Sequence, residues 1–273
     1  MKILNKILIL TIGLFLLACE DVIEVDLDTA PPRLVIDASI DWVKNTSGNE
    51  QKITLSTTTG YYSNEFPTVS GANITIANSL GTIFNFIEAS GTGEYICTDF
   101  EPIIGETYTL TILLNGETYT ATETLIATPS VEDTIEQNNE GGFGGDEIEI
   151  TYYYQDDGTQ ENYYLYGIKA PVVAFPQYAI ENDENTQGNL TPVYYSHKDL
   201  KPEDEINIKL YGISKRYYEY FKKVLTASGN DDGPFQSTPT AVRGNVLNQT
   251  NSDNYTFGYF RLSEVDIKNY VIQ

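Results

Sequence analysis

Apolar and polar residues alternate over two neighbouring stretches, residues 107–114 and 117–122. Every second residue from Tyr108 to Leu114 is apolar, which places these side chains on one face of a strand. Asn115-Gly116 lies between the stretches, and this dipeptide favours a type I′ turn because both central residues must take positive φ. The pattern predicts a β-hairpin.

Further short runs rich in β-branched and aromatic residues predict strands. They cover residues 34–36, 52–57, 73–77, 82–87, 94–98, 147–154, 162–168, 205–211 and 254–262. The strands of residues 32–128 show no long helical period, so we expect an immunoglobulin-like β-sandwich there. Gly105-Glu106-Thr107-Tyr108 indicates a tyrosine corner in this domain.

A second, tyrosine-rich β domain is predicted over residues 129–273, which gives a mainly β chain with two β-rich domains. Of the 21 tyrosines, 16 follow residue 150. One helix is expected near residues 214–227, capped by Ser214. The glycine-rich, acidic tract 131–147 reads as a flexible linker between the domains or as an early loop of the second domain.

The N-terminus carries a different pattern: two lysines, an apolar run from Ile7 to Leu17, and then Ala18-Cys19. The run is shorter than the roughly 20 residues of a transmembrane helix. It matches a bacterial lipoprotein signal over residues 1–18. We therefore expect Cys19 to be lipidated, by palmitate or similar acyl chains, and residues 19–31 to form an acidic spacer.

Charge excludes one class of partner. Removing residues 1–18 takes two lysines from 16 basic residues, which leaves 14 against 39 acidic ones and a net charge of −25. Nucleic acid is excluded because phosphate binding needs clustered Lys and Arg. Attachment to the membrane must come from the acyl chains at Cys19.

The chain lacks the residue patterns of common enzymes. His197 is the only histidine, in a loop-like stretch, and Cys97, expected to be a small buried hydrophobe, is the only thiol besides Cys19. We predict no catalytic residue, no metal site and no cofactor. Three acidic turns stay open as calcium candidates: residues 26–28, 156–158 and 230–233.

Tyrosine suits recognition surfaces because its flat ring ends in a polar group, so it can stack on sugars or line a peptide groove. In a strand, a pair such as Tyr194-Tyr195 points one ring inward and one outward. The candidate partner or ligand residues are Tyr194, Tyr195, His197, Lys215, Arg216, Lys222, Lys223, Phe235 and Arg243. Thr29 and Thr134 lie in Asp-Thr-aliphatic motifs and are candidate O-glycosylation sites.

Several segments together resemble a family of Bacteroidota lipoproteins catalogued as domain of unknown function 4249. They are residues 19–27, 32–40, 69–76, 93–95, 105–110, 214–221, 233–235, 239–246 and 257–260. The resemblance implies no established activity. It implies gene neighbourhoods with TonB-dependent receptors, and Glu20-Asp21 resembles an export signal to the outer face of the outer membrane.

From these features we expect a non-enzymatic, surface-exposed outer-membrane lipoprotein that assists a TonB-dependent receptor in capturing or gating a small-molecule or oligomeric nutrient. Two alternatives remain. One is a structural or adhesive β-sandwich module of the envelope, and the other is a hydrolase that uses a pair of carboxylates.

Overall fold

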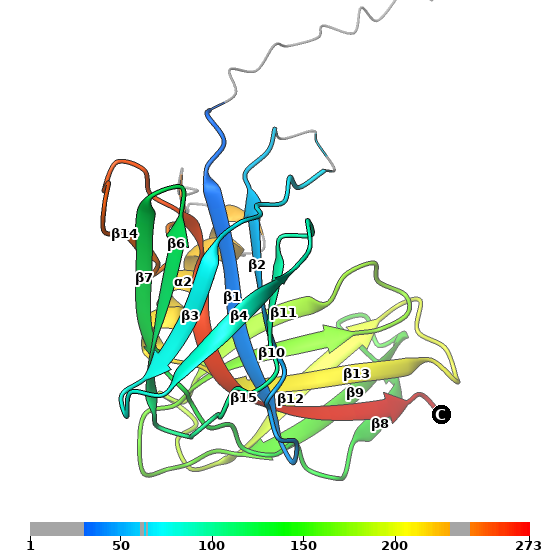
Figure 1. Ribbon diagram of the computed structural model, residues 1–273. Coiled ribbons are helices and arrows are strands. Elements are labelled where there is room, and N and C mark those ends of the chain that lie inside the picture. The colour runs from blue at the N-terminus through cyan, green and yellow to red at the C-terminus, as the bar shows by residue number, and fades with distance from the viewer. Residues whose placement is uncertain (1–29, 61–62, 64, 230–240) are drawn as a thin grey trace, which may run out of the picture. The chain divides into compact units, whose positions relative to one another are not determined.

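Seven strands form the first part of the fold. A computed structural model describes residues 30–60, 63, 65–229 and 241–273, and Figure 1 draws the other residues in grey. Residues 32–273 belong to one unit. The strands are β1 (Leu34–Val43), β2 (Gln51–Thr57), β3 (Asn73–Asn78), β4 (Ile83–Ala89), β5 (Glu94–Cys97), β6 (Thr107–Leu114) and β7 (Glu117–Thr124).

These strands make a sandwich of two sheets. β1, β2 and β5 pair in one sheet, and β4, β3, β6 and β7 pair in the other. β4 also pairs with β5 and so connects the two sheets. Because this is the arrangement of an immunoglobulin-like sandwich, the predicted fold class is confirmed.

Two local predictions for the sandwich are confirmed. β6 and β7 pair from Thr107 with Thr124 to Leu114 with Glu117, and the turn residues Asn115 and Gly116 have φ of 52° and 80°. The buried Tyr108 hydroxyl donates to the Glu101 carbonyl at 2.7 Å and accepts from the Ile103 N–H at 3.0 Å. This is a tyrosine corner, which fixes the approach to β6.

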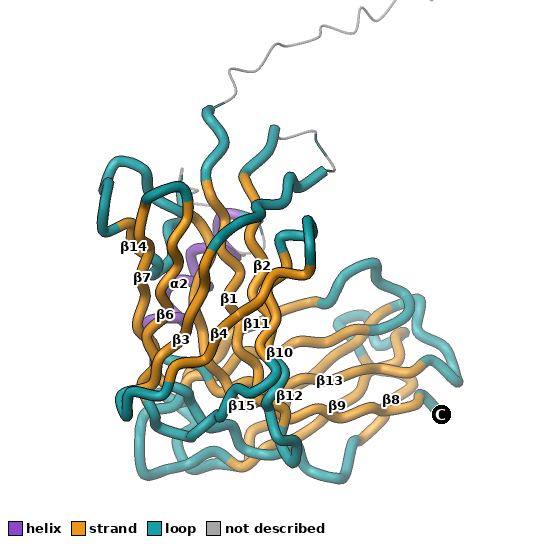
Figure 2. Tube along the Cα trace, viewed as in Figure 1, coloured by secondary structure: helices purple, strands orange, loops and turns teal. Residues whose placement is uncertain are grey.

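Strands β8 to β15 and one helix complete the described part of the fold, and Figure 2 shows how the strands and the helix are arranged. β8 (Glu136–Gly141), β9 (Glu147–Gln155) and β12 (Leu190–His197) form a three-stranded sheet in the order β12-β9-β8. β10 (Tyr163–Lys169), β11 (Gln177–Asn182) and β13 (Glu205–Gly212) extend the sheet of β1, β2 and β5 through β15, in the order β11-β10-β13-β15-β1-β2-β5. We call this the large sheet. The short β14 (Leu247–Asn248) pairs with β7.

The last strand, β15 (Phe257–Val271), belongs to both regions. Its first part runs parallel to β1, from Phe257 beside Val35 to Val265 beside Val43. Its second part pairs antiparallel with β13, up to Val271 beside Glu205. The sequence predicted strands at both ends of the chain but gave no sign that they pair.

The cores of the two regions differ in composition. The sandwich core is mainly aliphatic, with Ile, Leu and Phe from β1 to β7, and it also takes Val246, Phe260 and Leu262 from the end of the chain. The core between the three-stranded sheet and strands β10 and β13 contains five buried tyrosines: Tyr152, Tyr154, Tyr164, Tyr166 and Tyr195.

The one predicted helix is confirmed as α2 (Lys215–Ala227), with the Ser214 side chain accepting from the Tyr217 N–H. Tyr217 is buried and packs with Tyr211 and Tyr259 of the large sheet. The helix covers the face of that sheet opposite the tyrosine core. No helix among the described residues is long and apolar enough to span a membrane.

Two local expectations are wrong. The tract 131–147 contains β8 and the start of β9, so it is part of a sheet rather than a linker or loop. A bulge between Asn138 and Gly141 fits its glycines into the strand pairing. His197 ends β12, where it pairs with Ile148, instead of lying in a loop. Pro192 is tolerated within this strand because β12 is an edge strand.

The expected division at residue 128 stays a prediction. Most buried residues of the sandwich core lie between positions 36 and 125, whereas those of the tyrosine core begin at Val131. The C-terminal segment crosses this division, however, because β15 pairs with β1 and buries Phe260 in the sandwich.

Candidate ligand-binding groove

The outer face of the three-stranded sheet carries a groove. Alternation along β9 turns Ile150, Tyr152 and Tyr154 into the core and leaves Tyr153 on the other face. Along β12 the same alternation buries Tyr195 and leaves Tyr194 with 63% of its surface exposed. The predicted opposite orientation of the two rings is therefore confirmed.

Strand register brings the outward side chains together. Tyr153 lies opposite Pro192, and Tyr194 lies opposite Thr151, so the two tyrosines are diagonal neighbours on adjacent strands. Diagonal neighbours of this kind are about 7–8 Å apart, within reach of aromatic side chains. The two tyrosines therefore lie on the same outer face of the sheet, and we call this pair the aromatic strip.

Carboxylates border this strip on its β8 side. The Tyr153 hydroxyl donates to Glu136 Oε2 at 3.1 Å, and this bond raises the pKa of Tyr153. The open hollow beside the strip has a volume of about 620 Å³ and is lined by Glu132, Thr134, Glu136, Tyr153, Gln155 and Leu190.

This arrangement suits a neutral or cationic ligand with hydroxyl groups. Exposed rings supply flat apolar faces, and the two glutamates supply acceptors but no positive charge. The described residues contain no group of three or more metal-binding side chains. The groove therefore has the chemistry of recognition, through stacking and hydrogen bonds.

The predicted candidate residues fall in different places. Tyr194 belongs to the groove face, whereas Tyr195 lies in the core and is not a surface residue. His197 Nδ1 accepts from the Asp199 N–H at 3.1 Å, a local turn contact. Thr134 is exposed and lines the groove.

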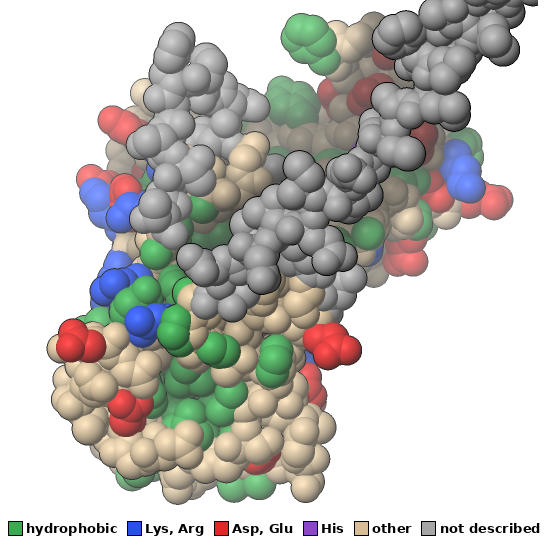
Figure 3. Space-filling model, turned by 90° about the horizontal axis from the view of Figure 1, so that it is seen from above, with side chains coloured by type: hydrophobic (Ala, Val, Ile, Leu, Met, Phe, Trp, Pro, Cys, Tyr) green, Lys and Arg blue, Asp and Glu red, His purple; other side chains and the backbone are tan. Residues whose placement is uncertain are grey.

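The basic residues of the helix form a solvated face. Lys215, Arg216, Lys222 and Lys223 are all exposed. Lys215 Nζ lies 3.5 Å from Glu161 and over the ring of Tyr163. Tyr217 and Phe221, on the other side of the helix, stack at 5.6 Å. In Figure 3 the Lys and Arg side chains gather mainly at one edge of the view.

Several predicted positions lie outside the described residues: Cys19, Thr29, Phe235 and the calcium candidates 26–28 and 230–233. In the third calcium candidate, Asp156 is buried and accepts from the Tyr164 hydroxyl and the Gly188 N–H, at 2.5 and 2.7 Å. Asp156 therefore holds two loops together through protein donors. Burial raises the pKa of the Cys97 thiol to about 11, which fits a structural residue.

The comparisons with known proteins identify the family. A family model described as domain of unknown function (DUF4249) matches residues 20–269. The chain belongs to the DUF4249 family. No curated protein matches this DUF4249 chain in sequence.

Two solved structures show partial likeness. One is a segment of two fibronectin type-III domains from chicken tenascin, with 13% identity, 66% of this chain and 90% of that chain covered, and a TM-score of 0.22. The other is a DUF4785 family protein from Legionella pneumophila, with 8% identity, 66% and 52% covered, and a TM-score of 0.26. Both scores are below 0.5, so the fold description rests on the strand order itself.

The structure gives roles to two segments of the DUF4249 chain. The buried Asn245 side chain makes two hydrogen bonds with the backbone of Phe260, both at 2.8 Å. Its Nδ2 donates to the Phe260 carbonyl, and its Oδ1 accepts from the Phe260 N–H. Gly258 has a φ of +89°, and a Cβ there would lie 2.0 Å from the Ile36 carbonyl oxygen. These residues hold β15 in place. The neighbouring Arg243 is exposed and lies over the Tyr255 ring at 3.5 Å.

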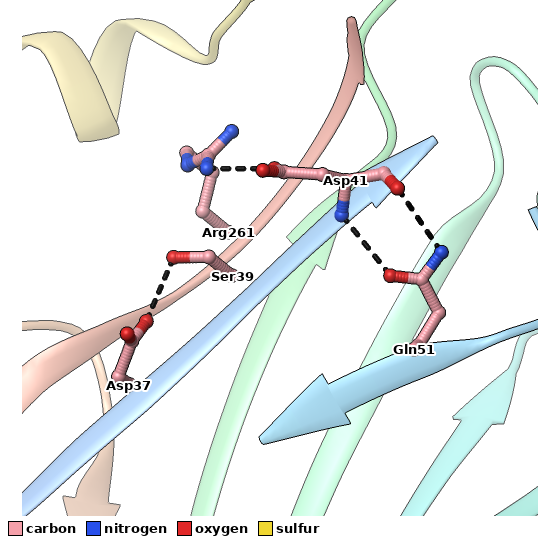
Figure 4. A network of polar contacts seen from close by, with 5 residues as sticks. All are labelled: Asp37, Ser39, Asp41, Gln51 and Arg261. Carbon is pink, nitrogen blue, oxygen red and sulfur yellow. Dashed lines mark hydrogen bonds and ion pairs between the residues drawn. The ribbon is translucent and has the colours of Figure 1, made fainter. Parts of the chain in front are cut away.

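Sequence reasoning missed a buried ion pair where the DUF4249 regions join. Arg261 of β15 is 5% exposed, and its Nη2 lies 2.7 Å from Asp41 Oδ1 of β1, as Figure 4 shows. Burial opposes the charge, but Asp41 keeps the pKa of Arg261 raised. Gln51 bonds to the backbone of Asp41 on the other side. Asp41 and Arg261 are 220 residues apart in the sequence, so no local sequence pattern indicates that they form an ion pair.

Proposed function

We propose that this protein is a non-enzymatic, surface-exposed lipoprotein of the outer membrane that assists a TonB-dependent receptor in capturing or gating a nutrient. The lipoprotein signal before Cys19 supports the anchoring. Membership of DUF4249, together with the resemblance described above, supports the link to a receptor.

The observation that carries the proposal is the groove on the outer face of the three-stranded sheet. Tyr153 lines the hollow and donates to Glu136, Tyr194 is 63% exposed on the same face of the sheet, and the hollow has room for a small molecule or for one unit of an oligomer. Capture would take place in this groove.

Tethering supplies the mechanism. Acyl chains on Cys19 would hold the protein in the membrane, and two or three chains make such an anchor stable. The 13 residues from Cys19 to Pro31 reach at most about 45 Å when fully extended. The fold would then stay beside the receptor at a high effective concentration, so weak contacts suffice for transfer.

Extraction of the tagged, lipidated protein from its own membranes with a gentle detergent tests this proposal. Mass spectrometry of the stoichiometric partners should identify a TonB-dependent barrel, and the variant Cys19→Ala should lose it, because the tether is gone. Recovery of the intact protein alone would contradict the proposal.

The same experiment separates the main alternative, a structural or adhesive module of the envelope. The sandwich and its flat outer sheet favour this alternative as a spacer. Recovery with adhesins in place of a barrel would support it. The hydrolase alternative would need two carboxylates that face each other in a deep cleft. Glu132 and Glu136 line an open hollow instead, and Asp156 and Asp183 are both buried and accept from Asn162.

A further inference from the structure

The outer face of the sheet β4-β3-β6-β7 carries no charged residue. Alternation turns every second residue of these strands away from the sandwich core. On β6 and β7 seven of the outward residues are threonines, and six of them pair with each other across the strands: Thr107, Thr109, Thr111, Thr120, Thr122 and Thr124. On β3 and β4 the outward residues are Asn, Thr, Ala and Ile.

The threonines make an ordered and flat surface. The hydroxyls of Thr107 and Thr124 lie 3.0 Å apart, and those of Thr109 and Thr122 lie 3.2 Å apart. Large apolar side chains stand on the same face, at its margins: Ile83, Ile87, Leu113 and Leu247 are 59%, 70%, 48% and 58% exposed. Helix α2 does not cover this face, since it packs on the large sheet beside Tyr211 and Tyr259.

The lack of charge contrasts with the rest of the chain. The sequence has 39 acidic residues and a net charge of −23. A partner with a basic surface would be recognised through those acids and would need no neutral face. A second copy carries the same acids, so two copies would repel each other least where their uncharged faces meet.

The size of the face also fits a symmetric pair. β3, β4, β6 and β7 have six to eight residues each, and β14 has two. With a spacing of about 4.8 Å between strands and a rise of about 3.3 Å per residue, they give a projected area of roughly 500 Å². The true accessible area of such a corrugated face is larger, so it approaches the roughly 800 Å² per partner of a standard interface.

We propose that this face joins two copies of the chain about a two-fold axis, sheet against sheet, on the membrane surface. Attachment of both copies to one membrane limits their diffusion to two dimensions and favours the pair. The apolar margins would bury Ile87 and Leu113, and the central threonines would pack without unpaired charge.

The test compares two variants of the full lipidated protein in detergent, with light scattering to measure the mass of the protein part. Thr111→Lys places a charge at the centre of the face, and we expect it to raise the dissociation constant of the pair at least tenfold. The matched control, Thr54→Lys, makes the same change on the outer face of β2, where Thr54 lies beside Asp37. It should leave the pair intact.

Both changes lower the net negative charge, so general repulsion cannot explain a loss seen only with Thr111→Lys. Salt gives a second readout: raising it from about 50 to 500 mM should tighten the wild-type pair, because it screens the acids outside the face. A monomeric wild-type protein, or a Thr111→Lys variant that pairs as well as wild type, would overturn the proposal. So would a neutral polysaccharide that binds this face of a monomer.

Discussion

The two regions of this molecule solve the same packing problem with different side chains. The sandwich core consists mainly of Ile, Leu and Phe, while five of the 14 buried residues in the C-terminal core are tyrosines, and the hydroxyls of Tyr154 and Tyr166 lie 2.8 Å apart there. Their outer faces differ as well. The sandwich presents a neutral threonine sheet, and the C-terminal region presents aromatic rings bordered by carboxylates.

This difference suits the two regions to the different roles that we propose for them. The sandwich strands alternate apolar residues with threonines, whereas strands that alternate tyrosines inward and outward supply a core and an exposed aromatic surface from one sequence pattern. β15 couples the two regions because each half of it completes one of them.

The largest expected effect comes from breaking this coupling. Asn245→Asp removes the donor to the Phe260 carbonyl and places a charge at a position that is 2% exposed. We expect the free energy of unfolding to fall by about 3 kcal/mol. Urea unfolding measures it, with the single tryptophan, Trp42, reporting on the sandwich and the tyrosines on the other region.

Both signals should shift together, because β15 belongs to both regions. Asn139→Asp, an exposed position in β8, is the matched control and should shift neither signal. A tyrosine signal that keeps its midpoint while the Trp42 signal moves would contradict a shared strand.

A smaller loss is expected inside the sandwich. Tyr108→Phe removes the hydroxyl that bonds to Glu101 and Ile103, and it leaves a backbone N–H without that partner. The free energy of unfolding should fall by about 1–2 kcal/mol in urea titrations. Tyr153→Phe, which loses an exposed bond to Glu136, should stay within about 0.5 kcal/mol of wild type. Equal losses in the two variants would refute a structural role special to the tyrosine corner.

The groove should respond to loss of a ring without loss of stability. On arrays of neutral oligosaccharides and of peptides, Tyr194→Ala should weaken binding of the best ligand about tenfold, or about 1.4 kcal/mol. Tyr194→Phe keeps the ring and should bind within about twofold of wild type. Unchanged binding by Tyr194→Ala would show that the ligand binds elsewhere and not on this groove face.

The smallest effect concerns pH. Burial raises the pKa of Glu123, whose carboxylate lies near the Tyr259 hydroxyl at 3.2 Å. Because its pKa is raised in the folded state, protonated Glu123 contributes fully to stability below about pH 4.5. This contribution is lost as the pH rises through the folded-state pKa of Glu123. Glu123→Gln should therefore be about 1 kcal/mol more stable than wild type at pH 7 and show no advantage near pH 4.

Thermal unfolding across this pH range measures the difference, and Glu140→Gln on exposed β8 serves as control. A Glu123→Gln variant that is less stable at pH 7 would show that the carboxylate is needed in its charged form.

The sequence predicted the features that depend on neighbouring residues. Alternation and the Asn115-Gly116 turn revealed the β6–β7 hairpin, Ser214 marked the start of the helix, and alternation of Tyr194 and Tyr195 set their opposite directions. Each of these depends on local backbone geometry, which short segments encode.

The sequence did not reveal features that arise from distant pairing or from polar strands. β8 reads as a linker because its residues are Glu, Gln, Asn and Gly, and only pairing with β9 makes it a strand. The contact between Arg261 and Asp41 spans 220 residues. The groove is formed by Glu136, Tyr153 and Leu190 from three strands. Among the residues on its face, the sequence singled out only Tyr194, as a candidate ligand residue, and Thr134, as a candidate glycosylation site.

The most direct test of the division between the regions is photo-crosslinking in native membranes. A crosslinking amino acid is placed at Leu113 on the threonine face in one strain and at Tyr194 on the groove face in another. Our account predicts a product of twice the mass of this chain from position 113 and a product with a TonB-dependent receptor from position 194. The same partner from both positions, or the two partners exchanged, would contradict it.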